Sequence, residues 1–182
     1  MISEPTINFE DLPVPDNVIE FSPECHVTED TITNWDRRFF QLSNTIAGWS
    51  EDQSRKVGCV IVSQENGILS TGYNGFPREV LDKPDRHSSL DGEKYYWFEH
   101  AERNAIYNAV RSGSALLNSR LYVNLFPCAD CTRAIIQSGV KELNTFAPDQ
   151  NEKFFQRSFE VSISMLNEAS VQLRLFPENA VV

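Results

Sequence analysis

The first regular pattern of apolar and polar positions begins near residue 33 and has the spacing of a helix. Its apolar members recur three or four residues apart and are Trp35, Phe39, Leu42 and Ile46. Thr33 followed by Asp36 resembles a capping box, in which the two side chains bond to each other's backbone N–H groups. The pattern therefore predicts an amphipathic helix over residues 33–49.

A strand pattern follows. Residues 57–62 are apolar and mostly β-branched, which is typical of a buried strand. Asn66-Gly67 is a frequent hairpin turn, and it separates this run from a second strand pattern at 68–74. These features predict an antiparallel hairpin.

Helix and strand patterns alternate through the second half of the chain. The expected helices cover 100–111, 128–138 and 151–167, and the expected strands cover 121–125, 142–146 and 171–176. Gly113 and Gly139 stand where the first two of these helices should end. A hairpin followed by this alternation predicts an α/β fold with three αβα layers and a mixed five-stranded sheet.

Residues 75–98 show no regular pattern and are expected to form a long loop that leads to His100. Loops of this length in compact domains are usually functional or disordered. The loop ends in the aromatic run Tyr95-Tyr96-Trp97-Phe98. Most of these rings are expected to pack the loop onto the core or onto a second subunit, and one could stack on a bound base.

The 182 residues are expected to form one domain with an acidic, proline-containing extension. Nine of the 26 acidic residues precede Arg37, the first basic residue, so the remainder holds 17 acids against 16 bases. The predicted division is an extension over 1–31 and a domain over 32–182. Two interpretations of the extension stay open: an extended arm, or a segment held on a neighbouring surface by apolar residues such as Ile19 and Phe21.

The composition also excludes several classes of partner. Neither part of the chain has the basic surface of a protein that binds polynucleotide phosphates. No apolar run reaches the ~20 residues of a membrane-spanning helix. The start of the chain lacks a secretory signal and four cysteines make no disulfide framework, so a cytoplasmic location is expected.

Two short motifs carry the chemistry. His100-Ala101-Glu102 has the form H-x-E, and Pro127-Cys128-Ala129-Asp130-Cys131 has the form P-C-x-x-C. One imidazole and two thiols suit Zn²⁺ and leave a fourth position for water. Together the two motifs are the signature of zinc-dependent nucleobase deaminases.

Each motif falls where a helix is expected to begin, and helix N-termini stabilise the thiolate form of cysteine. Glu102 is not required as a ligand, and we expect it to move a proton between water and the substrate. The alternative is a structural zinc turn with a solvated glutamate.

On these motifs the chain resembles the cytidine and deoxycytidylate deaminase superfamily, and within it the deoxycytidylate (dCMP) deaminases. The resemblance covers about residues 33–176. It extends to Ser54-Arg55-Lys56-Val57-Gly58, to the G-Y-N-G-x-P segment at 72–77 and to residues 134–140.

The resemblance implies zinc on His100, Cys128 and Cys131, with Glu102 as the proton carrier. It further implies that Asn74 bonds the sugar and that the Ala101 N–H and the Phe126 carbonyl read the pyrimidine edge. Arg55 is the candidate for the 5′-phosphate, because a guanidinium matches phosphate geometry.

The resemblance also implies a homo-oligomer, with dCTP and dTTP as candidate allosteric effectors. Some relatives bind a second, structural zinc, for which this chain has only His87 between residues 74 and 100, with Cys25-His26 in the extension. We interpret Cys25-His26 as incidental and Cys59 as a small core residue.

The function predicted is zinc-dependent deamination of a small cytosine nucleotide, most directly dCMP to dUMP and ammonia. The alternatives are a deaminase of dCTP, of another nucleobase or nucleoside, or of an adenosine in tRNA, and a nucleotide-sensing zinc protein without activity.

Overall fold

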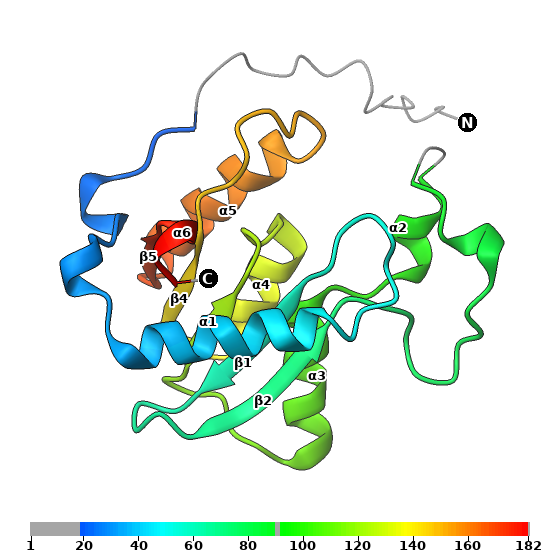
Figure 1. The fold of residues 1–182 in the computed structure, drawn as a ribbon, viewed down its shortest axis with the longest axis horizontal. Coiled ribbons are helices and arrows are strands. Elements are labelled where there is room, and N and C mark those ends of the chain that lie inside the picture. Colours follow the sequence, from blue (N-terminus) through cyan, green and yellow to red (C-terminus); the bar gives the residue numbers. More distant parts are fainter. Residues whose placement is uncertain (1–18, 90–91, 182) are drawn as a thin grey trace, which may run out of the picture.

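The computed structural model describes residues 19–89 and 92–181. Five strands form one sheet in the order β2-β1-β3-β4-β5 (Figure 1). They are β1 (Gly58–Val62), β2 (Ile68–Tyr73), β3 (Arg120–Val123), β4 (Glu142–Phe146) and β5 (Gln172–Phe176). β1 is antiparallel to β2 and β3, whereas β3, β4 and β5 are parallel. The prediction of a mixed five-stranded sheet is confirmed.

Helices cover both faces of this sheet. In Figure 1, α1 (Asn34–Ala47) crosses the strands, and it packs with α6 (Glu178–Val181) in one apolar cluster. The opposite face carries α3 (Ala101–Ser112), α4 (Ala129–Gln137) and α5 (Gln156–Glu168). Because side chains alternate along a strand, Val60 and Val62 join the α1 cluster, while Cys59 and Ile61 join the other. The three-layer prediction holds, and Cys59 is a core residue.

The local signals of the first half act as predicted. Thr33 is the N-cap of α1, and its hydroxyl and the Asp36 carboxylate form both bonds of the capping box. β1 and β2 form the hairpin, but their connection spans residues 63–67, so it is longer than a two-residue turn. Asn66 adopts a left-handed φ of 67° there, a conformation that asparagine tolerates well.

Three larger differences separate the predicted elements from the structure. α5 begins at Gln156, because Asp149 accepts the N–H of Asn151 and holds the preceding residues in a turn. The predicted loop over 75–98 contains η4 (Pro84–Arg86) and α2 (Lys94–Trp97). A backbone pair between Gly75 and Glu99 closes this loop at its base. The short α6 was not predicted.

Residues 19–31 lie against the domain. This segment contains η2 (Pro23–Cys25) and η3 (Glu29–Thr31). Ile19 is buried, the Phe21 ring meets the Phe126 ring edge-on at 5.9 Å, and the Val27 N–H donates to the Leu175 carbonyl at 2.8 Å. For this part of the predicted extension, the interpretation as a segment held on the surface is the better one. The apolar residues predicted to act likewise between 7 and 18 lie outside the described residues.

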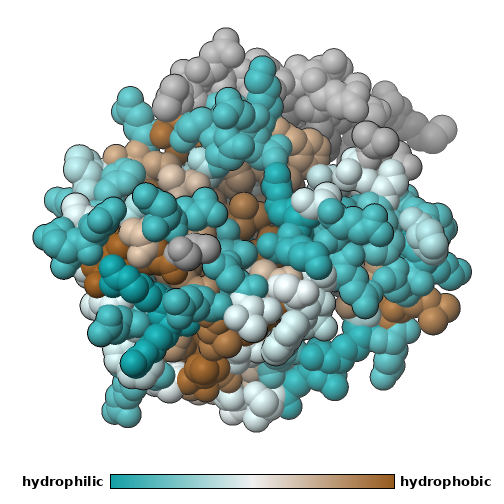
Figure 2. Space-filling model, in the orientation of Figure 1, coloured by the Kyte–Doolittle hydropathy of each residue, from teal (hydrophilic) through white to brown (hydrophobic). Residues whose placement is uncertain are grey.

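The view in Figure 2 shows a mainly hydrophilic surface with separate hydrophobic patches. Within the described ranges, no helix has the length and apolar character needed to cross a bilayer.

Candidate metal centre and active-site pocket

The three predicted metal ligands lie at the first turns of two neighbouring helices. His100 is the N-cap of α3 and Cys128 is the N-cap of α4, with Cys131 in the first turn of α4. Two serines of α5 hold the cysteine segment: Ser158 Oγ accepts the Ala129 N–H at 2.8 Å, and Ser162 Oγ donates to the Pro127 carbonyl at 3.1 Å. The turn that presents both thiols is thus fixed from a third helix.

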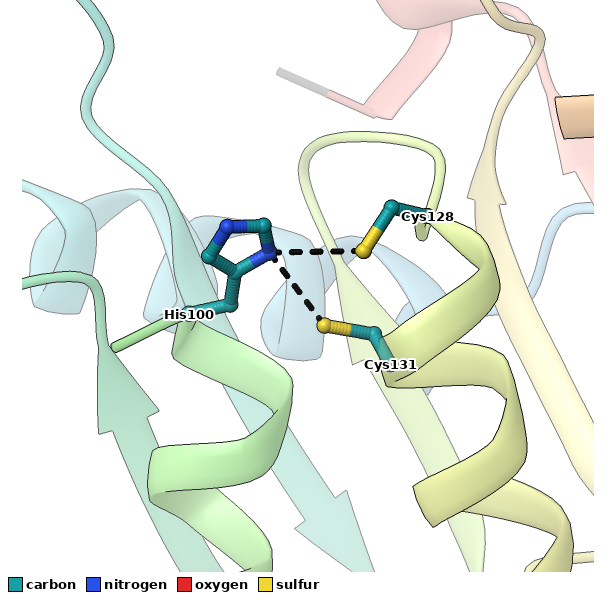
Figure 3. A group of neighbouring side chains, drawn as sticks. All are labelled: His100, Cys128 and Cys131. Carbon is teal, nitrogen blue, oxygen red and sulfur yellow. Dashed lines mark hydrogen bonds between the residues drawn. The ribbon is translucent and has the colours of Figure 1, made fainter. Parts of the chain in front are cut away.

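The ligand atoms converge on one point (Figure 3). His100 Nδ1 lies 3.5 Å from Cys128 Sγ and 3.4 Å from Cys131 Sγ. Two ligands of a tetrahedral zinc, at their usual bond lengths, are about 3.6 Å apart. The donor set and its spacing therefore fit Zn²⁺, and within the described part of the chain this is the group of side chains arranged to hold a metal ion.

Electrostatics favours the metal-binding form of one of the three groups, the Cys128 thiolate, whereas hydrogen bonding with Cys128 and burial raise the pKa of Cys131 well above its ordinary value. Hydrogen bonding with Cys131 lowers the pKa of Cys128 to about 4. Burial opposes this shift, and the hydrogen bond and charge of His100 add to it. A thiolate is the form of cysteine that binds metal. The hydrogen bond between His100 and Cys128 raises the pKa of His100.

Glu102 lies within the first turn of α3 and is buried, with 4% of its surface exposed. Burial raises the pKa of its carboxyl group, although the neighbouring His100 opposes this shift. A carboxyl group with a raised pKa can both accept and return a proton near neutral pH. Its position beside the metal ligands, in the same cavity, suits it to that task.

Glu102 and two of the predicted metal ligands, His100 and Cys128, line one cavity of about 240 Å³. All four residues predicted to contact the substrate also line it: Arg55, Asn74, Ala101 and Phe126. The folded chain therefore brings together the predicted site residues from four separate stretches of sequence.

The side chain of Asn74 is already held by three neighbours. Its Oδ1 accepts the Val57 N–H at 2.8 Å, and its Nδ2 donates to Asp52 Oδ2 at 2.9 Å and to the Arg55 carbonyl at 2.8 Å. Both amide hydrogens are used, so only Oδ1 keeps a free lone pair. A contact from Asn74 to a sugar would thus have to accept a hydrogen bond from a sugar hydroxyl group.

Arg55 lies at the exposed side of the cavity. Its side chain is 45% exposed and its guanidinium is paired with Glu152 at 2.6 Å. A phosphate at this position would compete with the Glu152 carboxylate.

The aromatic residues 95–98 divide between the two predicted roles, packing of the loop and lining of the pocket. Tyr95 and Phe98 line the cavity, and Tyr95 stacks on Phe154 at 5.4 Å. Trp97 lies under the Arg86 guanidinium, and Tyr96 is 85% exposed. Packing of the loop accounts for Trp97, while two of the four rings belong to the cavity wall.

Sequence reasoning missed a polar cluster in this cavity. Lys94 Nζ lies 2.6 Å from Asp52 Oδ2 and 2.6 Å from Ser54 Oγ. The sequence held one weak signal: Lys94 is the single basic residue between His87 and His100. Nothing in the pattern of the chain indicated that it would meet Asp52.

Comparison with known proteins agrees with this geometry. A family profile described as "Cytidine and deoxycytidylate deaminase zinc-binding region" matches residues 33–147. The chain belongs to the cytidine and deoxycytidylate deaminase family. The prediction of the family, and with it of a hydrolytic deaminase, is confirmed.

Two proteins with similar sequences have names that state a deaminase activity. An uncharacterized deaminase of Aliivibrio fischeri is 37% identical over 80% of this chain and 96% of its own length. The deoxycytidylate deaminase of Homo sapiens is 34% identical over 81% of this chain and 82% of its own.

The fold is shared with a dCMP deaminase from the cyanophage S-TIM5, solved in complex with dCMP and dUMP. That structure superposes with a TM-score of 0.61 and 20% identity, over 81% of this chain and 98% of its own. The predicted cytidine deaminase-like fold is confirmed.

Proposed function

We propose that this chain hydrolyses the 4-amino group of dCMP, giving dUMP and ammonia. The observation that carries the proposal is a metal-binding group and a buried glutamate in one cavity, in a member of a deaminase family. The choice of dCMP is supported by relatives that bear the name deoxycytidylate deaminase.

In this proposal His100, Cys128 and Cys131 hold Zn²⁺. When bound, the metal supplies a Lewis acid that activates water. Glu102 would accept a proton from the water that attacks C4, deliver it to the pyrimidine ring nitrogen and assist the departure of ammonia as the C4–N4 bond breaks.

The remaining predicted residues bind and orient the nucleotide. The Ala101 N–H and the Phe126 carbonyl read the pyrimidine edge, and Asn74 Oδ1 accepts a bond from the sugar. Arg55 attracts the 5′-phosphate at the exposed side of the cavity, where the phosphate replaces Glu152 as the partner of the guanidinium.

The proposal also covers the location, assembly and regulation of the enzyme. We assign it to the cytoplasm as a homo-oligomer that acts on a free nucleotide and binds neither polynucleotide nor membrane. The near-neutral charge beyond residue 36 supports a small substrate, and regulation by dCTP and dTTP is carried over from the resemblance.

The test is a substrate panel on zinc-loaded protein, with ammonia release measured for dCMP, dCTP, deoxycytidine, cytidine, guanine and a tRNA, each with and without dCTP as effector. We expect dCMP to have the highest kcat/KM. Glu102→Ala should keep the zinc and lose turnover by about 10²-fold or more. Absence of ammonia from every substrate would contradict the proposal, and loss of zinc from Glu102→Ala would contradict the role of Glu102.

A further inference from the structure

A buried cation lines the cavity and has no part in the roles assigned above. Lys94 comes from α2, in the segment between the hairpin and His100, and its side chain is 11% exposed. Buried lysines are rare unless they are paired. The partners of Lys94 therefore bear on its role in the cavity.

The partners form a compact anchor. Lys94 Nζ contacts Asp52 Oδ2 and Ser54 Oγ, both at 2.6 Å. Asp52 is 3% exposed at its side chain and accepts further hydrogen bonds from the backbone N–H groups of Ser54 and Arg55 and from Asn74 Nδ2. Asp52 is thus fully engaged within the protein, and it holds the ammonium group in one place.

The anchor leaves one donor without an oxygen acceptor among the described residues. An ammonium group has three N–H donors. The described residues supply oxygen acceptors for two of them, and the centre of the Phe98 ring lies 5.6 Å from Nζ. Because Lys94 also lines the cavity that contains His100 and Glu102, a bound ligand can supply the third acceptor.

The surroundings of this donor favour an anion over a neutral ligand. Attraction between charges is several times stronger in a buried setting than at the surface. Arg55 and Lys94 are each paired with a carboxylate at 2.6 Å, but Arg55 is 45% exposed against 11% for Lys94, so water weakens the attraction of Arg55 for phosphate more. Lys94 is the better placed of the two to discriminate between a phosphorylated and an unphosphorylated substrate.

We propose that Lys94, held by Asp52 and Ser54, contacts the 5′-phosphate and makes the cavity prefer a nucleoside monophosphate to the free nucleoside. This inference rests on the proposed deamination of dCMP, and it adds the residue that determines the phosphorylation state of the substrate.

The test compares dCMP with deoxycytidine in the wild-type enzyme and in Lys94→Gln. The glutamine amide can still donate to Asp52 while the charge is removed, and the free energy of unfolding of Lys94→Gln is measured alongside, because breaking a buried pair costs stability. We expect kcat/KM for dCMP to fall about 10- to 100-fold, the range for a hydrogen bond to a charged group, while kcat/KM for deoxycytidine stays within about threefold. Lys56→Gln is the matched control, because Lys56 is exposed and lies outside the cavity lining.

A purely structural role for Lys94 makes a different prediction. It would lower kcat/KM for both substrates by the same factor and leave the preference for dCMP unchanged, and that result would overturn the proposal. Binding of dUMP and deoxyuridine, measured by calorimetry, supplies a readout without turnover: Lys94→Gln should weaken dUMP binding alone. An inactive wild-type protein would count against the proposed reaction, whereas an active one with unaltered phosphate preference in Lys94→Gln would count only against Lys94.

Discussion

Asn74 Nδ2 and Asp52 Oδ2 are joined by a buried hydrogen bond of 2.9 Å. The bond links the G-Y-N-G-x-P segment to the segment that precedes β1. The same Asp52 oxygen receives Lys94, so one carboxylate fixes a predicted substrate contact and the buried cation together.

Replacement of Asp52 by alanine should therefore damage both stability and binding. It leaves Lys94 buried without its anion and removes the acceptor of Asn74, and breaking a buried pair costs about 3 kcal/mol. Urea unfolding should show a loss of this size, and KM for dCMP should rise. Glu65→Ala, in the exposed hairpin connection, serves as the control. A stability equal to that of the wild type would contradict the anchoring role.

Asp36 should make the stability of the domain depend on pH. Burial alone would raise the pKa of Asp36, but hydrogen bonds from Arg174, Thr33 and Tyr122 outweigh it and lower the pKa below the ordinary 3.8. The ionised form of Asp36 is therefore more favourable in the folded state than in the unfolded chain. Its contribution to stability is present above pH 3.8 and is lost as the pH falls through the pKa of the folded state.

The measurement is the free energy of unfolding of Asp36→Asn and wild type at pH 7 and near pH 3. We expect a deficit of about 2 kcal/mol for Asp36→Asn at pH 7, which shrinks at the lower pH. A deficit of the same size at both values would show that the charge of Asp36 is not what stabilises the fold.

Removal of the metal should loosen the helix starts as well as abolish activity. The three ligands tie α3 to α4, and metal that binds only the folded state adds its binding energy to stability. A chelator should lower the Tm, and metal analysis should find about one zinc per chain in the wild type and little in Cys131→Ser. Cys25→Ser should keep its zinc, since Cys25 lies in η2, outside the ligand group. Full zinc content in Cys131→Ser would refute the assignment.

Gly72→Ala should displace α3 from the sheet. An added Cβ would lie 2.3 Å from the Ala105 nitrogen and 2.4 Å from the Ala101 carbonyl oxygen, so backbone would have to move. We expect a loss of about 2–4 kcal/mol in stability and a fall in activity, because His100 and Glu102 move with α3. Gly75→Ala is the control, as its Cβ would meet only the Tyr73 ring, at 3.7 Å. Equal stability of the two variants would contradict the tight contact between β2 and α3.

Sequence patterns were sufficient to predict most of the fold and the three side chains that converge as candidate metal ligands. Periodicity, the capping box at Thr33 and the H-x-E and P-C-x-x-C spacings are local, so neighbouring residues carry the whole signal. The start of α5 was misplaced because a side-chain turn at Asp149 overrides helical spacing. The predicted roles of Asn74 and Arg55 stay predictions, although both residues line the cavity.

The polar partners inside the cavity required the folded chain. Lys94 meets Asp52 across a sequence separation of 42, and Arg55 meets Glu152 across a separation of 97. No local pattern encodes such a pairing, because it depends on how α2 and the segment before α5 pack against the segment before β1 in the folded chain. The sequence thus indicated which chemistry the protein performs. Tertiary packing determined which charges surround the site, since burial and distance set how strongly two charges interact.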